Sequence, residues 1–191
     1  MTTGGGTFVA PTPRMRIRRH EALRPLSRDH HLALQLARGL QAGASAHLRA
    51  ELPAARSALV AHVQRVFTEE LAAHFDVEDR VLAPAVAGKS PDLDRVRSEI
   101  EAEHAELAAL VARLSDPALD DAAIDAALDR FGRMLEGHVR REEREYYERI
   151  QEVLDDASMQ ALGVALDRHL VFHGKPTAPA TREGAALSGG R

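Results

Sequence analysis

The sequence predicts an all-α protein: an antiparallel, up-down-up-down four-helix bundle with flexible termini and a short fifth helix. Ala, Leu, Glu and Arg dominate the central part, and alternating β-branched residues are scarce, which favours helices over strands. Apolar residues recur at helical spacing in four stretches separated by short breaks, as in such a bundle. With 191 residues, of which 45% are hydrophobic, the chain is long enough for one domain with its own core.

The first two helices follow from their start and stop signals. Ser27 is a candidate N-cap for the first helix, which is expected to run to about Leu40. The second helix is expected to begin after Pro53. Pro84 and Gly88 would close it, because proline disrupts a helix interior and glycine favours its end.

The remaining helices are placed in the same way. Ser90 caps the third helix, and Pro91 takes its first helical position. The sequence SDP at 115–117 ends that helix, and the apolar stripe of the fourth helix spans 124–150. A short fifth helix is expected at about 158–170.

The two ends of the chain differ from the middle in composition. Residues 1–25 are rich in Gly, Thr and Pro, which predicts a flexible arm, and residues 173–191 predict a disordered tail. The helical domain is therefore expected over residues 26–172.

Composition excludes several classes of function. The net charge of −4 argues against a nucleic-acid partner, and no apolar run is long enough to span a membrane. The absence of cysteine removes disulfides, thiolate metal sites and thiol catalysis. The first twenty residues contain no apolar run typical of a signal peptide, so we expect a cytoplasmic protein.

Each of the four apolar stripes contains a histidine where leucine would be expected, and two stripes also carry a glutamate four residues later. Residues four apart lie on one helix face, so all six side chains are expected inside the bundle: His30, His74, Glu78, His104, His138 and Glu142. Any one of them could be an ordinary hydrogen-bonded core or edge residue. The whole set is harder to explain, because burying two carboxylates costs several kcal/mol each unless a cation compensates.

The sequence also contains an internal repeat. Residues 71–82, LAAHFDVEDRVL, align with residues 135–146, LEGHVRREEREY, and the segments that begin at residues 29 and 103 align more weakly. The chain thus reads as two helical hairpins, each supplying one His and then His-x-x-x-Glu. Four imidazoles and two carboxylates suit first-row transition metals, iron or manganese most readily, and two shared carboxylates would serve two ions.

Several neighbouring residues are alternatives or additions to this set. His30 shares a face with Ala33 and Leu34, so it is favoured over His31 as the inward histidine of the first helix. Tyr146 lies one turn beyond Glu142. Its phenol could bond a bridging carboxylate, although core filling is the favoured role. Glu101 and His104 match one ferritin-type Glu-x-x-His unit, but Leu135 stands where the second unit needs its glutamate.

The order H…HxxxE…H…HxxxE over about residues 27–154 resembles the hemerythrin-like (HHE cation-binding) proteins. This resemblance implies a four-helix bundle with a non-haem, oxo- or hydroxo-bridged di-iron centre of two iron ions. The four histidines would be terminal ligands, and Glu78 and Glu142 would be the bridges. Oxygen-carrying hemerythrins have a further histidine where this chain has Ala108, and an aspartate at the position of Glu142. These departures from the family pattern imply that one iron site is more open or filled by water, and they argue against simple reversible oxygen carriage.

The leading hypothesis from the sequence is a bacterial non-haem di-iron protein that binds or senses O₂, NO or peroxide, with peroxide decomposition as an open option. Such small molecules would be its partners, together with a separate signalling protein if it is a sensor. An iron-binding or storage module without turnover is the alternative, and a metal-free structural bundle is a third.

Overall fold

The structure, a computed structural model, describes residues 18–172, and all regular secondary structure in this range is helical, without strands. The all-α prediction is confirmed for these residues. Residues 1–17 of the predicted arm and the predicted tail, residues 173–191, lie outside the described part of the chain.

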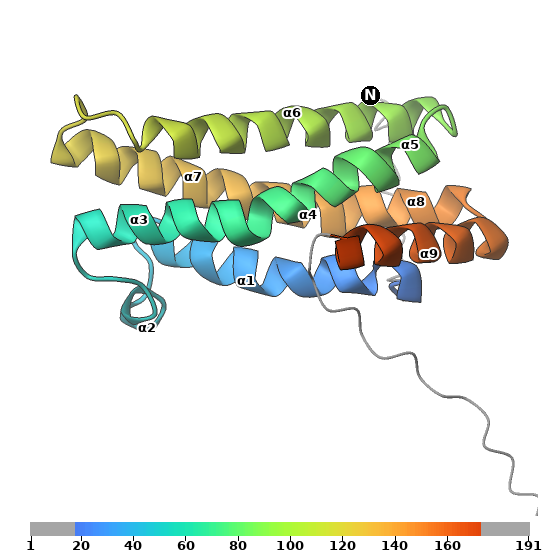
Figure 1. Cartoon of the computed structure of the whole chain (residues 1–191), viewed down its shortest axis with the longest axis horizontal. Helices are drawn as coiled ribbons and strands as arrows, with labels where there is room; N and C mark the ends of the chain where they lie inside the picture. The colour runs from blue at the N-terminus through green and yellow to red at the C-terminus, as the bar shows by residue number, and fades with distance from the viewer. Residues whose placement is uncertain (1–17, 173–191) are drawn as a thin grey trace, which may run out of the picture.

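Four long helical segments lie side by side (Figure 1). The first follows a 3₁₀ turn, η1 (Glu21–Leu23), and is α1 (Arg24–Leu40). The second comprises α3 (Arg56–Val66), η2 (Phe67–Leu71), α4 (Ala72–Val77), η3 (Glu78–Leu82) and α5 (Ala83–Val86). The third is α6 (Pro91–Arg113), and the fourth comprises α7 (Asp121–Arg141), η4 (Glu142–Tyr146) and α8 (Tyr147–Val153).

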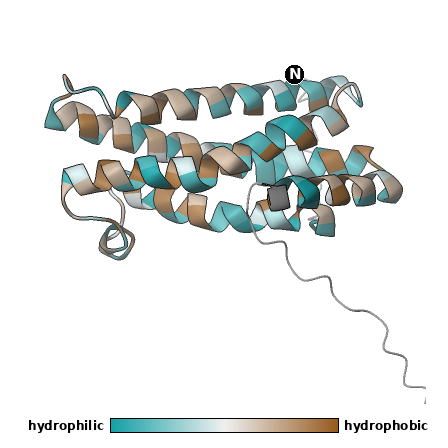
Figure 2. Cartoon of the chain, in the orientation of Figure 1, coloured by the Kyte–Doolittle hydropathy of each residue, from teal (hydrophilic) through white to brown (hydrophobic). Residues whose placement is uncertain are grey.

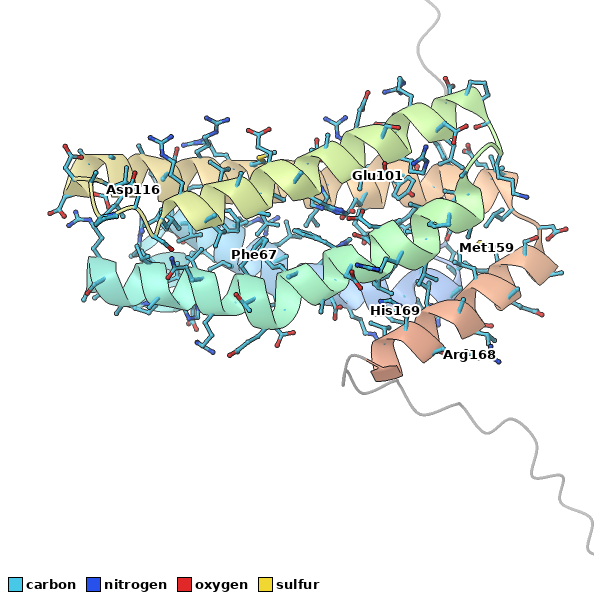
Figure 3. All side chains as sticks on the ribbon, turned by 45° about the horizontal axis from the view of Figure 1, so that its top comes forward. Phe67, Glu101, Asp116, Met159, Arg168 and His169 are labelled. Carbon is cyan, nitrogen blue, oxygen red and sulfur yellow. The ribbon has the colours of Figure 1, made fainter. Side chains whose placement is uncertain are left out.

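Two further helices lie outside these four segments. The short helix α2 (Ala46–Ala50) forms part of the connection between α1 and α3 and is not among the helices predicted from the sequence. The expected fifth helix is α9 (Asp156–Phe172), which packs against η1, η3 and α4. Its Met159 is buried in the core, and His169 hydrogen-bonds to Asp76 of α4 at 2.9 Å (Figure 3).

The predicted start of the first helix and the predicted stop at Pro84 are wrong, whereas the predicted end of the second helix near Gly88 is correct. The first helix begins at Arg24 rather than at Ser27, because Pro25 fits the first turn, where no N–H donor is needed. The second helix continues past Pro84 to Val86. A π-helical turn ends at Leu82, so Pro84 lies in the first turn of α5 and does not stop the helix. The predicted cap at Ser90 is correct: its side chain accepts a hydrogen bond from the backbone N–H of Leu93.

Apolar and polar residues alternate along the helices (Figure 2), and the apolar ones form two separate clusters. One cluster fills the half nearer α2 and includes Leu36, Val63, Leu107 and Phe131. The other fills the half nearer α9 and includes Leu26, Leu82, Ile100, Ile150 and Leu166. The two cores leave a polar layer between them, and the residues of this layer form the candidate site.

Candidate metal centre

The polar layer consists of the six residues selected from the sequence. Their side chains are almost fully enclosed, with exposed fractions of 4% or less: His30, His74, Glu78, His104, His138 and Glu142. Among residues 18–170, no other histidine or carboxylate side chain is buried. His31, the alternative in the first helix, is exposed, so the choice of His30 as the inward histidine is confirmed.

The six side chains form two overlapping groups that could each hold a metal ion. One group contains His30, His74 and both glutamates, and the other contains His104, His138 and both glutamates. Within each group the candidate ligand atoms lie within 4.8 Å of one another. The glutamates are common to both groups, an arrangement that can hold two ions and share two carboxylates between them.

The nitrogen and oxygen atoms of the two groups converge closely. In the first, Nε2 of His30 lies 3.1 Å from Nε2 of His74 and 3.1 Å from Oε2 of Glu142. In the second, Nε2 of His104 lies 3.4 Å from Oε2 of Glu78. Nε2 of His138 lies 3.4 Å from Oε1 of Glu142. All four histidines therefore point the same ring nitrogen, Nε2, at the shared carboxylates.

Local helix geometry helps to place the two glutamates. Each of them begins a π-helical turn, η3 at Glu78 and η4 at Glu142. The N–H of each glutamate still bonds to the carbonyl of the histidine four residues earlier, so His and Glu remain one turn apart on the same face. Single π turns are rare and occur often at functional sites. Their presence at both matching positions extends the internal repeat from sequence to backbone geometry.

The other ring nitrogen of each histidine, Nδ1, hydrogen-bonds to a carboxylate. The four pairs and their distances are His30 with Glu143 at 2.7 Å, His74 with Asp29 at 3.3 Å, His104 with Asp79 at 2.8 Å and His138 with Glu103 at 3.0 Å. A carboxylate at Nδ1 fixes the ring orientation and the tautomer that leaves Nε2 free as an acceptor or metal ligand.

These four carboxylates are not among the residues predicted from the sequence, although the sequence contains a signal for them. Asp29 and Glu103 directly precede the first histidine of each hairpin, and Asp79 and Glu143 directly follow the glutamate of each hairpin. Each carboxylate bonds to a histidine on a different helix from its own, so only the tertiary structure shows the pairing.

The tyrosine next to the site is Tyr147, not Tyr146. The hydroxyl of Tyr147 donates a hydrogen bond to Oε1 of Glu78, and its ring stacks on His30 at 5.7 Å between centroids. Tyr146 is buried in the apolar cluster nearer α9, which agrees with the core-filling role favoured for it. An α-helix would align Tyr146 with Glu142, but the wider π turn η4 adds one residue and brings Tyr147 to the site.

The electrostatics of the metal-free site follow from its many carboxylates. Burial lowers the pKa of His104, but Asp79, Glu142 and Glu78 outweigh it and raise this pKa to about 11. In the same way Glu142 and Glu143 raise the pKa of His30 to about 10 against the effect of burial.

The pKa values of one carboxyl group and one phenol of the site are also shifted, the first downward and the second upward. Burial favours the neutral acid of Glu142, but the charge of His138 and its neighbours holds the pKa of this group well below its usual value. Burial and the nearby carboxylates raise the pKa of Tyr147 far above its usual value, so its phenol stays protonated and can donate. Without metal, the site is a buried cluster of opposite charges.

Residues 21–150 match the family described as the hemerythrin HHE cation-binding domain. The chain belongs to this family. No match was found among curated proteins or among solved structures. The match covers both hairpins of the repeat and all six residues of the polar layer, so the hemerythrin HHE domain of this chain contains buried His/Glu clusters that could bind metal.

The donor set of this hemerythrin HHE domain fits a pair of metal ions. Five buried atoms of the site have no hydrogen-bond partner, although charged neighbours lie close: Oε2 of Glu78, both carboxylate oxygens of Glu142, and Nε2 of His104 and of His138. Leaving a buried polar atom unpaired costs about 1–3 kcal/mol, and more when it is charged. A multivalent cation bound by these atoms would remove that penalty. Glu101 takes no part in either group and pairs with Arg97 at 2.6 Å.

A cavity of about 120 Å³ adjoins the hemerythrin HHE site. Its polar lining includes His30, His74, His138 and Glu142, and its apolar lining includes Ala33, Leu71, Phe75, Leu135 and Val139. It continues to exposed residues such as Leu32 and Glu70. Ala108, where oxygen-carrying hemerythrins have a further histidine, is half-buried and does not line this cavity. The cavity is much smaller than the roughly 300–1,000 Å³ of pockets for drug-sized ligands.

Proposed function

We propose that this protein is a non-haem di-iron protein that binds or senses O₂, NO or peroxide. The six residues of the polar layer would be the ligands, with His30 and His74 on one ion, His104 and His138 on the other, and Glu78 and Glu142 shared. The observation that carries the proposal is the pair of overlapping His/Glu groups, in which five buried atoms lack hydrogen-bond partners. Imidazole and carboxylate ligands favour iron, and manganese is the competing choice.

The small cavity beside the site supports a small-molecule partner. Iron held by these residues would supply electrons to a diatomic or peroxide ligand. The chain's own residues would hold the metal ligands in place and limit the access of water to the ions. The four Nδ1 hydrogen bonds fix the imidazoles, and apolar walls such as Leu71 and Phe75 restrict water.

The fold and location also form part of this proposal. We propose the family's up-down-up-down four-helix bundle for the four long segments, which is supported by their side-by-side packing and by the short connections on either side of α6 (Figure 1). None of the helices in residues 18–172 has both the length and the apolarity that a membrane crossing requires. A cytoplasmic protein without a nucleic-acid or membrane partner accords with the net charge of −4.

Metal analysis of the purified protein, together with its ultraviolet–visible spectrum, tests the proposal. Protein produced with iron should contain about two iron ions per chain and show absorption that changes on addition of azide, NO or peroxide. The Glu78→Gln variant should lose most of the metal. Glu106→Gln makes the same chemical change at an exposed residue that pairs with Arg130, and it should retain the metal. Fewer than about one metal per chain in the unmodified protein would overturn the proposal.

The same preparation separates ligand binding from the alternative of an iron-binding or storage module. Storage without turnover predicts stoichiometric iron, a spectrum that does not respond to azide or NO, and no oxygen evolution from peroxide. The cavity that reaches His30, His74 and Glu142 favours ligand binding, because a closed store needs no access for a second small molecule.

A further inference from the structure

The two central glutamates are not equivalent, although the repeat makes their positions equivalent. Oε1 of Glu78 accepts a hydrogen bond from Tyr147, whereas the oxygens of Glu142 face only imidazoles of the site and make no hydrogen bond of good geometry. The repeat relates Tyr147 to Ala83, 64 residues earlier, and alanine has no hydroxyl to offer. A single side chain thus distinguishes the two halves of the centre.

Tyr147 is itself firmly held. Its side chain is fully enclosed, with 0% exposure, and its ring lies nearly parallel to that of His30, at an interplanar angle of 8°. The guanidinium carbon of Arg19 lies 5.0 Å from the ring centroid. Arg19 also hydrogen-bonds to the carboxylate of Glu143, which in turn bonds to His30. The phenol therefore has little freedom to move away from Glu78.

We propose that Tyr147 is a positioning residue that fixes the carboxylate of Glu78 for metal binding, while Glu142, on the cavity side, is held by no such donor. This inference rests on the proposed metal centre and adds an asymmetry to it. A phenol that donates to one oxygen of Glu78 leaves Oε2 directed toward His74 and His104, at 3.5 and 3.4 Å. Residues that orient metal ligands in this way typically contribute about 10–100-fold to metal affinity.

The chain offers a matched control for this role. Tyr146→Phe and Tyr147→Phe make the same change at adjacent buried residues, but Tyr146 makes no hydrogen bond to either glutamate. The probe is Co²⁺, loaded into the full-length protein and released to excess EDTA. Tyr147→Phe should release Co²⁺ about tenfold faster than the unmodified protein and alter its visible absorption band. Tyr146→Phe should match the unmodified protein in both respects. Equal release rates for all three proteins, or equal acceleration in both variants, would overturn the inference.

A second measurement tests the contact without metal. The chain has two tyrosines and no tryptophan, so in Tyr146→Phe the near-ultraviolet absorption reports Tyr147 alone. Removing the acceptor charge with Glu78→Gln should shift this band to shorter wavelength, and the control Glu106→Gln should not. An unshifted band would show that the hydrogen bond is absent and would overturn the inference. If the unmodified protein fails to hold Co²⁺ or iron, the proposed function fails first and the positioning role fails with it. If metal binds and the band does not shift, only the role of Tyr147 fails.

Discussion

Without metal, the protein should lose stability as the pH rises above neutrality. In the folded metal-free protein the pKa of His30 is raised to about 10 and that of His104 to about 11, from 6.5. Because these pKa values are raised on folding, protonated His30 and His104 stabilise the folded state, and this contribution is fully present below pH 6.5. The contribution is lost as the pH rises through 10 and 11. Between pH 7.5 and 9.5 the folded state therefore holds about two more protons than the unfolded state.

The size of the effect follows from this proton count. One proton corresponds to about 1.36 kcal/mol per pH unit, so two give up to about 2.5 kcal/mol per unit when partial protonation of the unfolded state is included. For a chain of this length the melting temperature should fall by about 5–10 °C per pH unit. The assay is thermal unfolding followed by circular dichroism in EDTA at pH 7.5, 8.5 and 9.5.

Adjacent histidines provide the control. His30→Gln should remove about half of this pH dependence, and His31→Gln, at an exposed position, should leave it unchanged. A melting temperature that stays constant or rises over this range in the metal-free protein would refute the reasoning. Metal binding must displace these two protons, about one for each ion, so the affinity for each Co²⁺ ion should rise by about tenfold per pH unit over this range.

Four further predictions concern the hydrogen bonds that support the site and the packing of the helices. Asp79→Asn should weaken Co²⁺ binding about tenfold or more in a chelator competition, because a neutral amide holds His104 less firmly than a carboxylate does. The control variant Asp92→Asn, at an exposed residue, should leave Co²⁺ binding unchanged. Gly132→Ala would place Cβ 2.5 Å from a carbonyl oxygen of α1 and should lower the free energy of unfolding in urea by about 1–3 kcal/mol. Gly137→Ala meets nothing within 4 Å and should raise it by about 0.5–1 kcal/mol. Phe131→Ala should lower it by about 3–5 kcal/mol without changing the metal content of the folded protein.

The sequence by itself determined the helical class and the six residues of the polar layer. Both depend on periodicity: a histidine on an apolar stripe and a glutamate four residues later must share a helix face. The choice of His30 over His31 rested on the same argument, and burial confirms it. The assignment of the six residues as metal ligands, and of O₂, NO or peroxide as partners, stays a prediction.

Other features of the site depend on the tertiary structure and cannot be predicted from helical periodicity. The π turns at Glu78 and Glu142 change the helix register locally, so counting in steps of 3.6 raised Tyr146 as a candidate, with core filling as its favoured role, whereas Tyr147 bonds to the site. The Nδ1 partners come from other helices, and their pairing depends on how the helices pack. Local spacing is encoded in consecutive residues, whereas the cross-helix bonds, the cavity and the inequivalence of the two glutamates arise only when the four segments come together.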